Sequence, residues 1–167
     1  MQKNPLISAI DADIKALDLN SADYSKDFDN LYQALELFQE VISSADIESL
    51  FDLKVKPLER MLLEQPGWLQ YYSQYEVELS SASRYLQLIL DEHVSKIWIS
   101  LTENHKRDLN GTDKAKYINS STEYLRLRKP ILAIEEMLEK AKSVTGSLTA
   151  QGYSLTAYFR SRVVMEG

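Results

Sequence analysis

The sequence of 167 residues contains no cysteine, and it has only five glycines and four prolines. Without cysteine the chain has no disulfide, no thiolate zinc site and no cysteine nucleophile, which fits a reducing compartment. No apolar run approaches the roughly 20 residues that a membrane-spanning helix needs. The first residues, Met1-Gln2-Lys3-Asn4-Pro5, lack the apolar core of a secretion signal. We therefore expect a soluble cytoplasmic protein, and the 44% apolar content is enough for a hydrophobic core.

Signatures of catalysis are also missing. The sequence has no Gly-rich phosphate loop and no nucleophile elbow. His93 and His105 stand twelve residues apart, too far to share a metal on one helix, so we expect both on a helix surface. Asp11 and Asp13 are two residues apart, and on a helix they face different directions. We expect a protein that is not an enzyme and that has neither a metal nor a cofactor.

The net charge of −6 is unevenly distributed. Residues 1–83 hold 6 Lys and Arg against 15 Asp and Glu, whereas residues 84–167 hold 13 against 10. An acidic chain disfavours nonspecific binding of duplex nucleic acid, but a basic second half is able to form a local phosphate-binding surface. The alternative is a solvated charge distribution that has no partner.

Helical periodicity runs along the chain, and no segment has the pattern of a strand. Pro5 fits the first position of a short helix, and Asp27 is a plausible N-cap for the next. A third helix is expected from Asp46, kinked or divided at Pro57 and ended by the break at Gln65-Pro66-Gly67. The apolar stripes of the first two helices are Ile7, Ile10, Ile14 and Leu17, followed by Phe28, Leu31, Leu35, Phe38 and Ile42.

Two long antiparallel helices are expected to dominate the second part of the chain. One runs from about Trp68 to Leu109 and ends at Gly111, which suits a left-handed position. The other is capped at Thr112 or Asp113, and Pro130 should bend or restart it. The prediction is an all-α protein, an elongated helical bundle. It has an acidic N-terminal helical region at residues 1–66 and a long helical hairpin at residues 67–167.

The last helix carries a heptad-like seam in which apolar residues alternate at spacings of three and four. Small residues at Ala141 and Gly152 allow another helix to approach closely. A long helix cannot bury such a stripe alone, so the rest of the chain or a second copy must cover it. We expect an oligomer interface formed by Leu138, Ala141, Leu148, Gly152, Leu155, Phe159 and Val163.

A basic run flanked by an aromatic residue, Tyr124 to Lys129, precedes this seam. Single-stranded nucleic acid is held by such mixtures, because cations bind the phosphates and planar rings stack on the bases. Alternatively, the tyrosines are half-buried packing residues and the basic groups pair with Glu123, Glu135 and Glu136. The candidate nucleic-acid-binding residues are Lys96, Lys106, Arg107, Lys114, Lys116, Tyr124, Arg126, Arg128 and Lys129.

The C-terminal stretch resembles the phage recombination mediators of the UvsY family. The residues that carry the resemblance are Gln151-Gly152-Tyr153-Ser154-Leu155, then Arg162 ten residues after Gly152, and the terminal Gly167. Upstream, the segment from Leu109 through Tyr124 is similar to the family's turn and the start of its last long helix. The resemblance covers about 60 residues. The chain departs from the family in its acidic extension over the first 65 residues or so, and Lys96, Lys106 and Arg107 are chosen from charge and position alone.

The resemblance implies a non-enzymatic helical protein that assembles into a ring-like homo-oligomer through its C-terminal helices. Such proteins bind single-stranded DNA, contact the phage single-strand-binding protein and a RecA-like recombinase, and help to load the recombinase. It also implies a phage protein that acts in the bacterial cytoplasm.

Two other functions fit the residues. One is a phage-encoded helical adaptor that binds a partner protein through its acidic N-terminal half, since an acidic surface can dock on a basic face. The other is a structural coiled-coil component.

Overall fold

The computed structural model describes residues 4–17, 28–43, 58–104 and 109–166, and these residues form helices and short connections with no strand. The side chains of residues 58, 59, 61, 159 and 162–166 are not described. The helices are α1 (Pro5–Ala16), α2 (Asp29–Ser43), α4 (Leu58–Asn104), α5 (Gly111–Asn119) and α6 (Thr122–Glu166). The predicted all-α class is confirmed.

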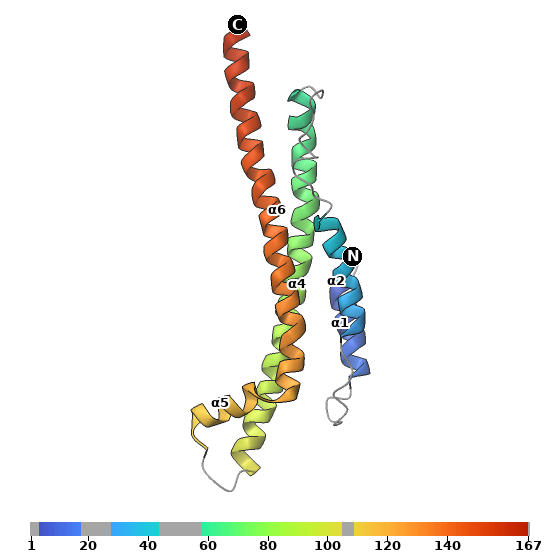
Figure 1. The fold of residues 1–167 in the computed structure, drawn as a ribbon, viewed down its shortest axis with the longest axis vertical. Coiled ribbons are helices and arrows are strands. Elements are labelled where there is room, and N and C mark those ends of the chain that lie inside the picture. The colour runs from blue at the N-terminus through green and yellow to red at the C-terminus, as the bar shows by residue number, and fades with distance from the viewer. Residues whose placement is uncertain (1–3, 18–27, 44–57, 105–108, 167) are drawn as a thin grey trace.

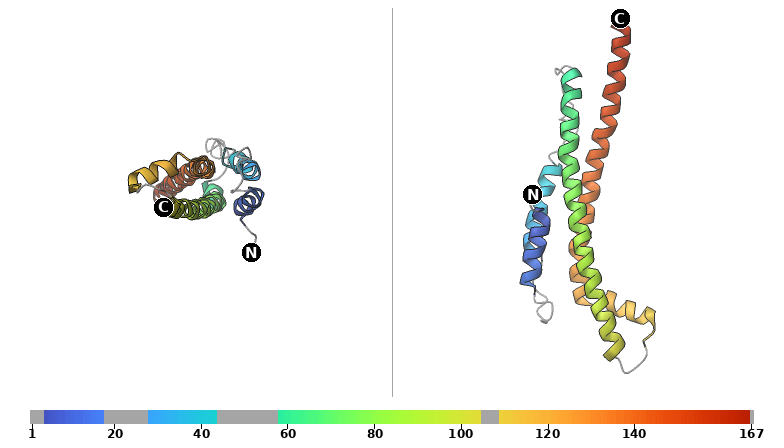
Figure 2. Two further views of the ribbon diagram at one scale, coloured as in Figure 1. Left: turned by 90° about the horizontal axis from the view of Figure 1, so that it is seen from below. Right: turned by 180° about the vertical axis from the view of Figure 1, so that it is seen from behind.

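Two long antiparallel helices form the body of the molecule (Figure 1). The 47 residues of α4 pack along the 45 residues of α6, and the shorter α1 and α2 lie together on one flank of this pair. At the lower end in Figure 1, α5 lies across the hairpin, and at the other end α6 extends past the start of α4. Figure 2 shows from below that α1 and α2 occupy one side only.

The core lies where α1 and α2 meet the long pair. Each of the four helices contributes one buried apolar face, as the periodicity predicts for amphipathic helices. The five apolar residues predicted for α2 and its preceding residue are all buried. Fully buried members of the core include Leu6, Ile10, Phe28, Leu31, Leu79, Leu86, Leu127, Ile131, Ile134 and Leu148.

The predicted break at Gln65-Pro66-Gly67 is wrong, because α4 continues through it. A helical proline costs about 3 kcal/mol, since its ring removes one hydrogen bond and crowds the preceding turn. Here Pro66 and Gly67 are exposed, so water can reach the carbonyl group that loses its donor. On the other side of the helix, Gln65 is bonded to α6. Tertiary contacts therefore maintain the helix, and the expected boundary between residues 66 and 67 falls inside α4.

The connection between the long helices also differs from the prediction. Gly111 is the first residue of α5 and has no positive φ, so it is not a left-handed helix end. Asn110 caps α5, because its side chain accepts a bond from the backbone N–H of Asp113 at 2.9 Å. A turn at Ser120 and Ser121 then leads into α6. The cap therefore lies at Asn110 rather than at Thr112 or Asp113, and the turn at Ser120 and Ser121 divides the segment into α5 and α6. The predicted restart at Pro130 is absent, because α6 runs unbroken through it.

The two aspartates of α1 tie the N-terminal helices to the rest of the core. Asp13 is only 4% exposed, and its carboxylate accepts bonds from the Leu31 N–H at 2.9 Å and from the Asn30 amide at 2.7 Å. It thus caps the N-terminus of α2 from a neighbouring helix. Asp11 accepts a bond from the Tyr85 hydroxyl of α4 at 2.7 Å, and this bond is the main cause that raises the Tyr85 pKa.

Several expectations concern residues outside the described ranges. They are the Asp27 cap, the third helix from Asp46 with its division at Pro57, and the surface position of His105.

Replacement of Asp13 by Ala should lower the free energy of unfolding by roughly 1–3 kcal/mol, because it leaves buried N–H donors of α2 without an acceptor. Asp13→Asn keeps one acceptor oxygen and should cost less. Chemical denaturation followed by circular dichroism measures both changes. Glu40→Ala, at an exposed position of α2, is the control and should change stability by less than about 0.5 kcal/mol. Equal effects of Asp13→Ala and Glu40→Ala would contradict the capping role.

Candidate nucleic-acid interface

The end of the hairpin where α4 meets α5, here called the hairpin tip, gathers basic and aromatic side chains. Lys114 of α5 places its Nζ 5.5 Å from the centre of the Trp98 ring and 3.0 Å from the Thr102 hydroxyl, both on α4. A Cβ at position 111 would lie 3.8 Å from the Trp98 ring, which is an ordinary van der Waals contact, so the approach does not require the glycine. A cation over an indole face is attracted by the ring's quadrupole. Lys114 therefore anchors α5 against α4.

Other side chains of the hairpin tip remain open to solvent. Tyr117 is 56% exposed and Trp98 is 39% exposed, so both rings are accessible at the surface. Lys116 is exposed and makes no ion pair within the described part of the chain. Lys96 pairs with Glu92 on the surface at 2.7 Å, and the bond from Lys96 lowers the Glu92 pKa. Such an exposed pair contributes little and opens readily to another anion.

The predicted run from Tyr124 to Lys129 is largely engaged with the chain itself. Tyr124 packs against the core, and Leu127 is fully buried. Arg128 lies 3.5 Å from Glu135, and Lys129 places its Nζ 5.8 Å from the Tyr32 ring of α2. Arg126 is half-buried.

These contacts match the packing alternative in part. Glu135 is one of the expected acidic partners, but Glu136 pairs with Lys140 instead, at 2.9 Å. Lys106 and Arg107 lie outside the described residues. The structure therefore brings Lys114 together with Trp98, a residue that sequence reasoning missed. The spacing of four residues between Trp98 and Thr102 was visible in the sequence, but the packing of α5 against α4 was not.

The seam predicted for assembly is covered by the same chain along much of its length. Ala141 and Leu148 are 1% and 0% exposed because α4 packs on them, and Leu138 is half-buried. Leu155 is half-buried further along α6. The side chains of Phe159 and Val163 are not described. An interface at Ala141 and Leu148 is thus intramolecular in this fold.

Gly152 lies in a close contact between the two long helices. The Gln65 amide donates a 2.7 Å hydrogen bond to the Leu148 carbonyl oxygen. A Cβ at position 152 would lie 2.7 Å from the Gln65 Nε2, closer than real contacts allow. The glycine therefore makes room for the glutamine side chain.

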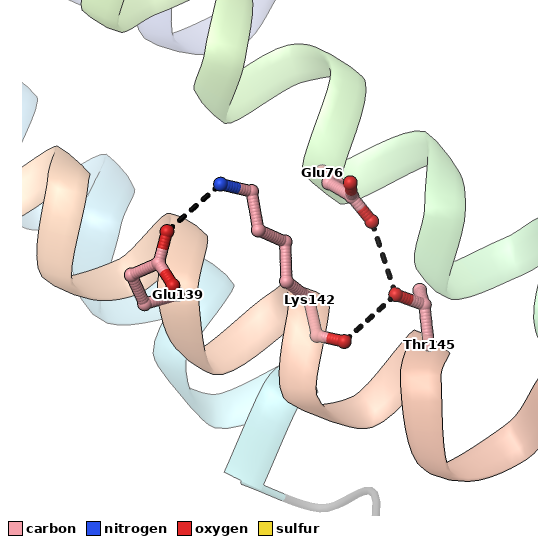
Figure 3. Close-up of polar contacts among 4 residues, drawn as sticks. All are labelled: Glu76, Glu139, Lys142 and Thr145. Carbon is pink, nitrogen blue, oxygen red and sulfur yellow. Dashed lines mark hydrogen bonds and ion pairs between the residues drawn. The ribbon is translucent and has the colours of Figure 1, made fainter.

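A polar contact interrupts the seam two turns away (Figure 3). The Thr145 hydroxyl lies 3.0 Å from both a Glu76 carboxylate oxygen of α4 and the Lys142 carbonyl oxygen, and its single proton can serve one of them at a time. Lys142 donates to Glu139 at 2.8 Å, and this bond is the main cause that raises the Lys142 pKa. Because the hydroxyl can also bond within its own helix, the Glu76 contact links α4 to α6 without leaving buried Thr145 unsatisfied when it breaks.

The opposite end of α4 carries a second aromatic cluster. Trp68, Tyr71, Tyr72 and Tyr75 contact one another in sequence, and Tyr75 packs edge-on against Phe38 of α2 with ring centres 4.9 Å apart. A bond from the Tyr75 hydroxyl to Tyr71, with burial as the second cause, raises the pKa of Tyr75 to about 12. Among the described residues, no cation lies over a ring of this cluster.

His93 is half-buried between the long helices rather than on the helix surface. Its Nε2 is buried and has no hydrogen-bond partner among the described residues. Burial lowers the pKa of His93, Lys96 lowers it further, and Glu123 of α6 opposes the shift. The neutral imidazole is therefore favoured in the folded state.

The described ranges contain neither a candidate metal site nor a membrane-spanning helix. No group of three or more His, Cys, Asp or Glu residues is placed to hold a metal ion there. No helix there has the length and apolar content to cross a membrane.

Comparisons of the chain with protein-family models, with curated proteins and with solved structures found no match.

Replacement of Gly146 by Ala should stabilise the protein by about 1 kcal/mol, because this helical glycine is exposed and a Cβ there meets nothing within 4 Å. Gly152→Ala should gain less, since the new methyl group displaces the Gln65 amide and loses its hydrogen bond. Urea unfolding measures both. In a Gln65→Ala background the two glycine substitutions should become equivalent, and a difference that persists would contradict the contact.

Stability should also depend on His93 in a defined direction. Because the folded-state pKa lies below the usual 6.5, the unfolded chain binds a proton that the folded chain does not. The free energy of unfolding should therefore fall as the pH drops below about 6.5, until the folded-state pKa is passed. His93→Gln should flatten this part of the pH profile, measured by denaturant titration. An identical profile in the variant would contradict the assignment.

Proposed function

We propose that this chain is a non-enzymatic protein that binds single-stranded nucleic acid at the hairpin tip. What supports the proposal is the exposure of two rings, Trp98 and Tyr117, at the end of the hairpin where Lys114 lies on Trp98 and Lys116 is exposed. Exposed rings stack on unpaired bases, and each stacked base contributes about 1–3 kcal/mol. Duplex bases are already stacked and offer no free faces, so the chemistry favours the single strand.

The electrostatic part of this interface is modest. Lys116 makes no ion pair with another described residue. Lys114 is held on the Trp98 ring, and Lys96 is held by Glu92. A few weak contacts give useful affinity when several copies act together, because assembly raises the effective concentration. The proposal therefore includes a homo-oligomer.

The wider biological role rests on the resemblance to the UvsY family. On that basis we propose a recombination mediator, which helps to load a RecA-like recombinase onto single-stranded DNA and contacts the single-strand-binding protein.

A second candidate is an adaptor that acts through the acidic N-terminal half. The observation that favours it is Leu37, which is 64% exposed on the outer side of α2 beside the exposed Glu36. An apolar side chain with acidic neighbours suits a basic partner surface.

Binding is tested by fluorescence anisotropy with labelled single-stranded and duplex oligonucleotides at two salt concentrations. Tyr117→Ala should weaken single-strand binding by roughly 5- to 150-fold, the equivalent of one stacked base. Lys116→Ala should reduce the salt dependence by about 0.7 in the slope of log K against log salt. The matched control is Tyr153→Ala, which removes a 75% exposed tyrosine from α6 near the other end.

The outcomes separate the candidates. Arg126, Arg128 and Lys129 replaced together by Ala should weaken binding less than Tyr117→Ala, since two of these side chains are held by Glu135 and Tyr32. A larger effect of the triple variant would move the site to that run. Absence of single-strand binding by the wild-type chain at low salt would overturn the proposal and favour the adaptor.

A further inference from the structure

A line of exposed apolar side chains runs along α4 on the side opposite the buried residues of that helix. Val77, Leu88 and Ile99 are 64%, 67% and 55% exposed. They follow one another at intervals of eleven residues, which is three helical turns, so they lie nearly in line. Leu88 stands two residues from the buried Leu86 and Leu90, and this places it roughly 160° around the helix from the core.

No described helix of the chain covers this line. The α1 helix touches α4 on another side, where Asn4 bonds the Glu78 carbonyl and Asp11 accepts from Tyr85. In the view from behind in Figure 2, α4 runs in front of α6 where the two overlap. Exposed apolar side chains that recur on one face of a helix are a candidate contact for another helix.

The residues between the apolar positions are arranged symmetrically about Leu88. Arg84 lies four residues before it and Glu92 four residues after it. Ser81 and Ser95 lie seven residues before and after it. Val77 and Ile99 lie eleven residues before and after it, and Gln74 and Thr102 lie fourteen. These four pairs of positions are therefore matched in charge, polarity or apolar character on the two sides of Leu88.

This symmetry is what a two-fold interface between antiparallel copies requires, because each residue then meets its mirror position on the partner. Leu88 would meet Leu88, Val77 would meet Ile99, and Arg84 would meet Glu92. In a parallel arrangement Arg84 would instead stand beside its own copy, and like charges in contact are unfavourable.

The charges of this face are available for such pairing. Arg84 is exposed and makes no ion pair within the described residues. Glu92 pairs only with the exposed Lys96 of its own helix, at 2.7 Å. Exchange of a surface contact of this kind for a partner's arginine costs little.

We propose that a second copy of this chain packs antiparallel on the outer face of α4, with the two-fold axis at Leu88. The contact runs from Val77 to Ile99, a helix length of about 33 Å. It uses a different surface from the hairpin tip and does not require nucleic acid. Because the two copies are antiparallel, the two tips lie at opposite ends of the dimer.

The test is the mass of the full-length protein in sedimentation equilibrium without nucleic acid. The wild type should give twice 19.2 kDa, or a multiple of that dimer. Leu88→Asp should weaken the dimer at least tenfold, because it buries a charge at the axis. The matched control is Leu132→Asp, a 52% exposed position on α6, which should leave the mass unchanged.

The register is tested by charge exchange. Arg84→Glu alone and Glu92→Arg alone should each weaken the dimer about tenfold or more, since both place like charges together on the two-fold related sites. The double variant Arg84→Glu with Glu92→Arg should restore wild-type association. Failure of that restoration would overturn the antiparallel register.

Cross-linking gives an independent readout, because the natural chain has no cysteine. Leu88→Cys should form a disulfide-linked dimer under mild oxidation, whereas Leu132→Cys should not. A monomeric wild type would overturn the proposed dimer. Single-strand binding by such a monomer would leave the proposed nucleic-acid site standing, so the two proposals fail separately.

Discussion

The antiparallel packing of α4 on α6 is the interaction on which the rest of the structure depends. The buried apolar face of α4 runs from Tyr72 to Leu101 and that of α6 from Leu127 to Leu148, and neither helix can bury its face alone. Apolar faces by themselves permit sliding, whereas polar contacts fix the relative position. Here the Gln65 amide bonds the Leu148 carbonyl, and buried Thr145 meets Glu76. The register of the long pair then places α5 across its end and offers a flank to α1 and α2.

Two acidic residues of the N-terminal part stabilise the packing of the helices, a role that their charge alone does not indicate. Asp13 satisfies the first N–H groups of α2, and Asp11 holds Tyr85 of α4. These contacts join α1 to α2 and to α4, and the two short helices α1 and α2 would be marginal alone. The acidic balance of this half is therefore partly a property of its packing. The outer side of α2, with exposed Leu37 and Glu36, remains the part that a partner is able to reach.

Two surfaces stay open once these internal contacts are made, and they differ in chemistry. The hairpin tip combines rings with lysines, which suits a flexible polyanion with exposed bases. The outer face of α4 is a straight apolar line with balanced charges, which suits another helix of the same kind. An antiparallel dimer through that face separates the two tips, so a single strand would engage one tip of each dimer at a time. Larger assemblies would then depend on the end of α6.

The sequence by itself determined that the chain is helical, because its apolar residues recur at spacings of three and four and its breakers are few. It also determined the buried face of α2, where each apolar residue of the stripe is in the core. The tertiary structure decided the rest. Packing against α6 keeps α4 helical through Pro66. Asp13 is buried because α2 supplies N–H donors to its carboxylate. Lys129 lies on Tyr32 because α2 folds back along α6. Local spacing specifies which residues share a helix face, but only the assembled helices determine what that face meets.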